Sequence, residues 1–199
     1  MNDAGPLIEY WFGEIKEDPA YIELCSKRWF GGSESTDSEI KDRFEHDLRD
    51  SIEGKREDWK NDPKGCLGLI LLWDQFPRNM YRDTPRSFAY DMLAQNLCLK
   101  ELENKTDNKL HPLERVFFYL PLEHAENLEM QKLSVACFRQ LARESTPALK
   151  KAIIEFCDYA VKHFKIIQKF GRFPHRNAIL NRPSTPREIA FLKKSGSSF

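Results

Sequence analysis

The sequence predicts an all-α fold made of antiparallel helical hairpins, and three observations lead to it. Apolar residues recur at intervals of three and four, as they do on one face of a helix. A capping residue followed by proline recurs along the chain, and this pair commonly begins a helix. Strands are not needed to explain any segment, because none alternates polar and apolar residues with a period of two.

Each expected helix has its own start signal. Residues 3–12 place apolar side chains on one face before Gly13. Thr36 and Glu39 form a capping box for a helix that continues to Ile52. The remaining cap-and-proline pairs stand at residues 18–19, 62–63, 84–85, 111–112 and 185–186. The length of the chain predicts one all-helical domain over residues 1–199, ordered to about residue 193 and ending in a short polar C-terminal tail.

An apolar run at residues 66–73 predicts a central, buried helix that leads into Asp74. Proline has no backbone N–H to donate, so we expect this helix to kink or stop at Pro77. Such a break frees Arg78 and Asn79 to turn away from the helix axis. A buried aspartate needs a partner, and arginine is the usual one.

A second informative helix is expected over residues 147–170. Its apolar residues form one stripe, and His163 occupies the position that completes the stripe. A core imidazole held by a neighbouring carbonyl or side chain would explain His163 without any function. The helix runs directly into the basic segment GRFPHRN at residues 171–177, so a functional histidine is the alternative.

The stretch LPLEHAENLEMQ, residues 120–131, adds a third group of polar side chains. Pro121 is expected to end one helix, and His124, Asn127 and Gln131 then fall on one face of the next. The three polar segments support two interpretations. One is a ligand or catalytic pocket, and the other is a structural network that ties helix ends together.

The chain resembles a bacterial family of unknown function, numbered 924, in the blocks LILLWDQFPRNMYRDTPRSFAYD, LPLEHAENLEMQ and HFKIIQKFGRFPHRNAILNRPSTPREIAFL and in the opening YWFG. This resemblance implies a TPR-like (tetratricopeptide-repeat-like) right-handed helical stack and a bacterial, cytoplasmic setting, and it implies no activity. The matching polar positions are Asp74, Gln75, Arg78, Asn79, His124, Glu126, His163, Arg172, Arg176 and Asn177. Two positions depart from the pattern: Trp73 replaces leucine, and Asn181 replaces glycine. Asparagine tolerates the left-handed conformation, so the turn at Asn181 is expected to survive.

Composition limits the setting and the partners of the protein. Its 31 basic and 31 acidic residues give a formal net charge of zero, which disfavours a large nucleic-acid or membrane footprint. The five cysteines are widely spaced, without a Cys-x-x-Cys pair, and favour free thiols in a reducing cytosol. Neither a basic leader nor a long apolar run is found, so a cytoplasmic protein is expected.

The polar segments suit a small anionic ligand, because guanidinium groups bind carboxylates and phosphates through paired hydrogen bonds. The candidate ligand-binding residues are Gln75, Arg78, Asn79, Arg172, His175, Arg176 and Asn177. If the protein is an enzyme, which the sequence leaves open, the candidate catalytic residues are His163, His124, Asp74 and Glu126. We expect Asp74, Arg78, His163 and Arg176 to meet around one cavity. We expect this cavity to bind an anion, because the arginines outnumber the nearest acids in the two Phe-Pro blocks.

No metal and no cofactor is predicted. His124 and Glu126 would point roughly 160° apart on a helix, which disfavours a metal shared with His163. The sequence also lacks a glycine-rich phosphate loop and a nucleophile motif. The alternative function is a protein-interaction scaffold that holds a peptide in a helical groove, with the polar cluster structural. The oligomeric state is left open.

Overall fold

The computed structural model describes residues 3–194 and 196–197. These residues form helices, turns and loops, and none of them lies in a strand, so the all-α prediction is confirmed. The expected polar tail lies partly outside the described residues. Within them, no helix combines the length and the apolar character needed to cross a membrane.

The α-helices are α1 (Gly5–Phe12), α2 (Pro19–Phe30), α3 (Glu34–Ile52), α4 (Pro63–Ile70), α5 (Phe76–Met80), α6 (Asp91–Glu103), α7 (Pro112–Glu123), α8 (Leu128–Glu144), α9 (Pro147–Phe170) and α10 (Pro186–Leu192). A π-helical segment, η2 (Leu71–Gln75), joins α4 to α5. Short 3-10 helices are η1 (Glu57–Asn61), η3 (Pro85–Phe88), η4 (Thr106–Lys109) and η5 (Pro174–Arg176).

Most of the predicted helix starts are correct. Asp18 and Asp62 each accept a hydrogen bond from the backbone N–H three residues later, and His111 and Thr185 each form a capping box. Two starts differ. The cap of α3 is Ser33, whose hydroxyl accepts from the Thr36 N–H, so the helix begins one turn earlier than expected. The pair at residues 84–85 begins only a 3-10 turn, and the following α-helix starts at residue 91.

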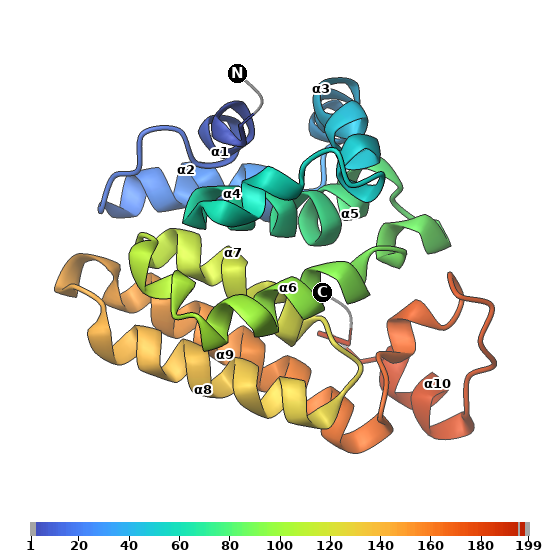
Figure 1. Cartoon of the computed structure of the whole chain (residues 1–199). Helices are drawn as coiled ribbons and strands as arrows, with labels where there is room; N and C mark the ends of the chain where they lie inside the picture. The colour runs from blue at the N-terminus through green and yellow to red at the C-terminus, as the bar shows by residue number, and fades with distance from the viewer. Residues whose placement is uncertain (1–2, 195, 198–199) are drawn as a thin grey trace.

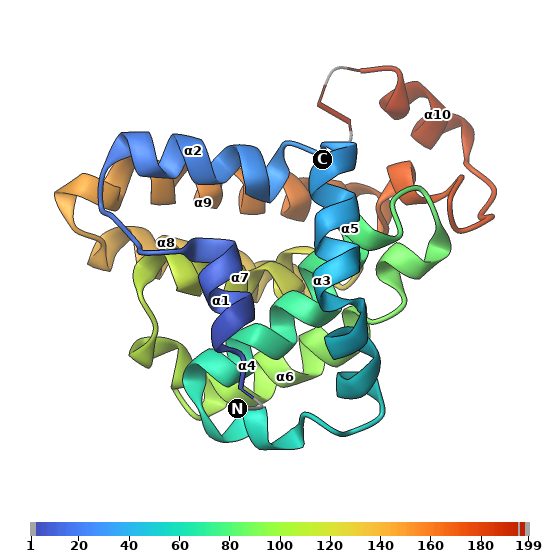
Figure 2. The same ribbon diagram turned by 90° about the horizontal axis from the view of Figure 1, so that it is seen from above.

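The helices are arranged in successive layers (Figure 1). Helices α8 and α9 lie side by side on one face, α6 and α7 follow, and α2, α4 and α5 come next, with α1 and α3 on the opposite face. Only two residues separate α8 from α9, and so short a link produces an antiparallel hairpin. Helix α10 stands at one end of the molecule in both views (Figures 1 and 2). A TPR-like, right-handed order of stacking stays a prediction.

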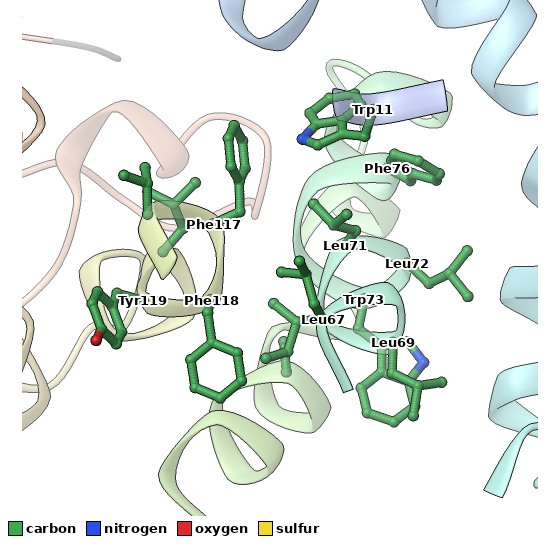
Figure 3. Close-up of a cluster of buried hydrophobic side chains, with 14 of the residues drawn as sticks. Trp11, Leu67, Leu69, Leu71, Leu72, Trp73, Phe76, Phe117, Phe118 and Tyr119 are labelled. Carbon is green, nitrogen blue, oxygen red and sulfur yellow. The ribbon is translucent and has the colours of Figure 1, made fainter. Parts of the chain in front are cut away.

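The centre of the core is the continuous segment from α4 through η2 into α5. Every residue from 65 to 77 is buried, as the apolar run predicts. Aromatic side chains of α1 and α7 lie beside it (Figure 3), and the Trp11 ring lies 5.2 Å from the Phe76 ring and 5.7 Å from the Phe117 ring. The burial of this segment fixes the position of the polar side chains at its end.

Of the two outcomes expected at Pro77, a kink or a stop, the stop is wrong. The chain widens into a π-helical turn just before the proline, where the Phe76 N–H donates to the Leu71 carbonyl five residues earlier. The wider turn accommodates a residue that has no N–H, so the helix continues through Pro77 to Met80. Asp74 and Gln75 therefore lie inside a buried helical segment, and π-helical turns of this kind are frequent at functional sites.

The expectation that Pro121 ends a helix is also wrong. Helix α7 continues through this proline to Glu123, so His124 and Asn127 lie in the connection to α8 and do not share a helical face with Gln131. Gln131 is buried in α8, where its amide nitrogen donates to three carbonyls, those of Leu122, Glu123 and Ala125. Its role is to hold the end of α7 in place.

Candidate functional site

A cavity of about 500 Å³ lies where three parts of the chain meet. They are residues 85–95, the connection between α7 and α8, and the segment 176–180. Both views place the chain before α6 and the segment around α10 at the same end of the molecule (Figures 1 and 2). Of the predicted site residues, Arg176, His124 and Glu126 line this cavity.

Arg176 is held rigidly on the cavity wall. Its guanidinium carbon lies 4.6 Å from the ring centres of both Phe88 and Phe173, so the group packs against two aromatic rings. Its Nη1 is 3.5 Å from a carboxylate oxygen of Asp91, and among the described residues none accepts a hydrogen bond from its buried Nε. Burial, together with the nearby charge of Arg78, lowers the pKa of Arg176 to about 10. The cation is thus desolvated and incompletely compensated.

Asp91 is already occupied by the second arginine of the site. Arg78 forms a two-pronged ion pair with it, with Nη–Oδ distances of 2.9 and 3.1 Å. Arg78 also lies 3.4 Å from Asp74 Oδ1 and donates to the Asp74 backbone carbonyl. The expectation that arginines outnumber the nearest acids is therefore wrong, because two arginines face two aspartates. Arg176 differs from Arg78 in having only one, longer contact with Asp91, at 3.5 Å.

Behind the cavity wall, Asp74 orients His124. The carboxylate of Asp74 is fully buried, and its oxygens lie 2.8 and 2.9 Å from His124 Nδ1. The Gln75 amide also donates to it. Burial alone would raise the pKa of Asp74, but Arg78 and His124 hold it below its ordinary value. The Asp74 carboxylate therefore favours the tautomer of His124 that carries its proton on Nδ1.

His124 is held in its neutral form by its surroundings. Burial lowers the pKa of the imidazole, and the opposing attraction of Asp74 does not restore it to the ordinary value of 6.5. The side chain is 14% exposed and lines the cavity. With Nδ1 directed to Asp74, Nε2 is the ring nitrogen that remains for a ligand, and no described residue forms a hydrogen bond with it.

His163, expected at the cavity, does not line it and lies beside His124 instead. Its Nδ1 is 2.9 Å from the Tyr159 carbonyl oxygen and 3.0 Å from a carboxylate oxygen of Glu123. Its ring centre lies 6.1 Å from that of His124. The structure thus brings Asp74, Arg78, His163 and Arg176 into one region, with only Arg176 on the cavity wall.

Three predicted ligand-binding residues are instead engaged by the protein itself. Arg172 binds Glu188 through two hydrogen bonds of 2.7 and 2.9 Å, which fastens α10. Asn177 donates to Ser184 and accepts from Arg182, and Asn79 donates to Asp37. These contacts close loops and tie helices together, as the structural interpretation predicted.

Two further candidates support the site from its edge. Glu126 accepts a hydrogen bond of 2.7 Å from the Phe173 N–H and two, of 2.6 and 2.9 Å, from Arg182. These bonds fix the segment that carries Arg176. The ring of His175 lies 5.6 Å from that of Phe173, and burial, followed by the charge of Arg176, lowers the pKa of His175 to about 4. His175 is therefore neutral at physiological pH.

The turn at Asn181 has a positive φ of 52°, as the tolerance of asparagine allows.

Sequence reasoning missed Asp91 and Phe88 as members of the site. Both follow the Thr-Pro pair at residues 84–85, which predicted a helix running through them. The α-helix instead begins at Asp91, and an acidic residue in a first helical turn is itself a start signal. The acidic residue at position 91 could have shown that the loop after Thr84 extends to the start of α6.

The Arg172–Glu188 pair gives α10 an expected pH dependence. The hydrogen bonds that Glu188 accepts from Arg172 outweigh the opposing effect of burial and lower the pKa of Glu188 from 4.5 to about 2. A carboxylate with a lowered pKa stabilises the folded state fully above its unfolded value, and the contribution is lost as pH falls toward the folded value. The free energies of unfolding of the parent and of Glu188→Gln, measured in urea, should differ most above pH 4.5 and converge toward pH 2. A difference that stays constant over this interval would contradict the assignment.

The described residues contain no cluster of metal-ligating side chains, and their cysteines form no disulfide. Within 3–194 and 196–197, no three His, Cys, Asp or Glu side chains are grouped so as to hold a metal ion. The five cysteines are all free, and three of them, Cys25, Cys66 and Cys98, are buried.

Comparison with known proteins identifies relatives but no activity. Residues 7–196 match the family described as bacterial protein of unknown function, DUF924. A solved structure of a protein of unknown function from Agrobacterium tumefaciens is similar, with 29% sequence identity and a TM-score of 0.80, and the match covers 96% of each chain. No curated protein matches the chain.

Proposed function

The chain belongs to the DUF924 family of bacterial proteins of unknown function, and we propose that it binds a small anionic molecule in the cavity lined by Arg176 and His124. The observation that carries this proposal is the incomplete pairing of Arg176. Its guanidinium packs against Phe88 and Phe173, and its buried Nε has no acceptor among the described residues. A desolvated cation with incomplete pairing costs free energy, and an anion in the cavity that pairs with the guanidinium charge would recover part of it.

The second support comes from competition for Asp91. Arg78 takes both carboxylate oxygens at 2.9 and 3.1 Å, so Arg176 receives only the longer contact of 3.5 Å. A carboxylate or phosphate in the cavity would give Arg176 a charged partner of its own. Because the guanidinium is already fixed in place, little conformational entropy is lost when the ligand binds.

The remaining wall suggests the rest of the ligand. Apolar side chains of Met92, Met130 and Leu180 face the same cavity as Gln95 and Asn127. A small molecule with one anionic end and an apolar or mixed body matches this lining, as in most small-molecule sites. Phosphate, nucleotides and small carboxylates are the first ligands to test.

Thermal-shift measurements test the anion site directly. A ligand present at 100 times its dissociation constant stabilises the folded state by about 2.7 kcal/mol, which raises the Tm of a chain of this length by roughly 5 to 10 °C. We expect a carboxylate or phosphate from a millimolar panel to do so with the parent and with Arg187→Gln, a control at an exposed arginine. Arg176→Gln should lose the shift. A flat response across the panel, or an equal shift in Arg176→Gln, would contradict the proposal.

A peptide-binding scaffold is the alternative function. It has less support, because Arg176 and His124 line one cavity, and Asp74 and Arg78 contact His124 and Asp91 beside it. Titration with the responding small anion distinguishes the two functions, since a peptide groove would not depend on one buried guanidinium. A cytoplasmic setting, with the free cysteines in reduced form, completes the proposal.

A further inference from the structure

Resting on the anion site described above, we propose that the cavity is catalytic: His124, oriented by Asp74, acts as a general base that activates water to hydrolyse an ester whose carboxylate group is held by Arg176. The anion would place the reacting bond within the cavity, and the imidazole would supply the proton transfer. This assigns a reaction class and a substrate class to the site.

The first argument is the geometry of the Asp74–His124 pair. An imidazole acts as a base through a nitrogen that has a free lone pair, and a carboxylate at the other nitrogen fixes the required tautomer. Asp74 Oδ1 and Oδ2 occupy Nδ1 at 2.8 and 2.9 Å, which leaves Nε2 for the cavity. The buried carboxylate also stabilises the imidazolium that forms when Nε2 takes a proton, without itself becoming protonated.

The second argument is what the cavity wall lacks. The described residues that line it include no serine, threonine, cysteine, lysine or tyrosine. A covalent intermediate on a side-chain hydroxyl, thiol or amine therefore has no candidate nucleophile there, and water is the simplest one. General base catalysis of water attack needs only a positioned base and a means to hold the substrate, and the wall offers both in His124 and Arg176.

The step balances with these groups alone. Nε2 of His124 takes a proton from water while the water oxygen bonds to the acyl carbon, giving a tetrahedral oxyanion. The bond from carbon to the alcohol oxygen then breaks, and the proton on Nε2 passes to that oxygen. The products are a carboxylic acid and an alcohol, and His124 returns to its neutral form.

A donor for the oxyanion is also present on the wall. Asn127 uses its Oδ1 to accept from the N–H groups of Glu129 and Met130, at 2.9 and 3.1 Å. No described residue hydrogen-bonds its Nδ2, so this amide can donate to a developing negative charge.

The charges around His124 set the expected pH profile. Asp74 and Glu123 favour the imidazolium, Arg78 disfavours it, and the rings of His163 and His175 belong to the same cluster. Because burial outweighs the attraction of Asp74, the pKa lies below 6.5. A rate that depends on neutral His124 should thus rise with pH, reaching a plateau by neutral pH.

The experiment compares two matched esters. 4-Acetoxybenzoate carries a carboxylate that cannot attack its own ester, and methyl 4-acetoxybenzoate is the neutral control; release of the phenol is followed by chromatography. We expect the parent to prefer the charged ester by at least about 10-fold in kcat/KM, since a charged contact of this kind contributes about 1.5 kcal/mol or more. His124→Gln should lower kcat by about 100-fold or more, the usual contribution of general base catalysis. Arg187→Gln should behave like the parent.

Two further variants separate positioning from binding. Asp74→Asn should lower kcat with little change in KM and move the pH profile to lower pH, because the imidazole loses its carboxylate. If this variant does not fold, His124→Asn provides a second test of the base. Arg176→Gln should raise KM for the charged ester only.

The outcomes distinguish the two proposals. A Tm shift with 4-hydroxybenzoate that depends on Arg176, without hydrolysis above the buffer rate, would overturn the catalytic inference and leave anion binding intact. Hydrolysis that survives in His124→Gln would also overturn it, because the base would lie elsewhere. If the parent neither binds the anion nor hydrolyses the ester, both proposals are overturned.

Discussion

Replacing Asp74 with alanine is expected to lower the free energy of unfolding by about 3 to 5 kcal/mol, because it removes one of the two aspartates that face the arginines Arg78 and Arg176. Asp74 has no solvent exposure and serves His124, Gln75 and Arg78 together. Without the carboxylate, the Arg78 charge keeps only Asp91, and the Gln75 amide loses its acceptor. A loss of this size is a large fraction of the stability of an ordinary domain, about 5 to 15 kcal/mol.

Urea denaturation of the parent, Asp74→Ala, Asp74→Asn and Arg176→Met measures this effect. Asp74→Asn keeps the shape of the side chain and should lose less than alanine. Arg176→Met keeps an unbranched apolar stem between Phe88 and Phe173 and removes a charge that the folded state disfavours, as its lowered pKa of about 10 indicates. We expect its stability to stay within about 1 kcal/mol of the parent, as is common when a functional residue is replaced.

This contrast separates the two interpretations of the polar cluster. A loss of several kcal/mol in Arg176→Met would mean that Arg176 stabilises the fold, and the anion site would lose its main support. A large loss confined to Asp74 would mean that Asp74 stabilises the fold in addition to its hydrogen bond with His124. One buried carboxylate can serve both roles because it contacts His124 after α7 as well as Gln75 and Arg78 in its own segment.

The fold was largely predictable from local signals. An aspartate before proline marks a helix start through a hydrogen bond made within three residues, so the signal and its structure lie in the same stretch of sequence. Pro77 and Pro121 misled the prediction because their effect depends on tertiary context. A π-helical turn in a tightly packed core accommodates Pro77, and α7 continues past Pro121 with its end held by Gln131 from the next helix.

The candidate site was only partly predictable, since its members differ in partners that are far apart in sequence. Arg172 and Arg176 lie four residues apart in one basic segment, and nothing local distinguishes them. Glu188 satisfies Arg172 with two short hydrogen bonds, whereas Arg176 meets an aspartate 85 residues away that Arg78 already occupies. Only the folded arrangement shows which arginine is left for a ligand.

Replacing Phe117 with alanine should destabilise the protein by about 3 to 5 kcal/mol, the usual loss when a buried phenylalanine is truncated. The side chain is fully buried in α7, and its ring lies 4.9 Å from that of Trp29, 5.4 Å from Phe12 and 5.7 Å from Trp11. These rings belong to α1 and α2, so Phe117 is one of the contacts through which the N-terminal helices pack on the centre of the molecule. The Trp11–Phe76 contact is another (Figure 3). Urea unfolding measures the loss.

Phe170→Ala is the matched control, because Phe170 is only half-buried and belongs to a small separate cluster with Ile167 and Phe191. Its loss should be clearly smaller, since less apolar surface is exposed and a smaller cavity is left. None of the ring partners of Phe117 lines the cavity, so folded Phe117→Ala should keep the parent's response to an anion while melting earlier. Equal losses at the two positions would show that the aromatic cluster around Trp11 is not the main core, and a lost anion response in folded Phe117→Ala would show that the cavity depends on how the N-terminal helices pack.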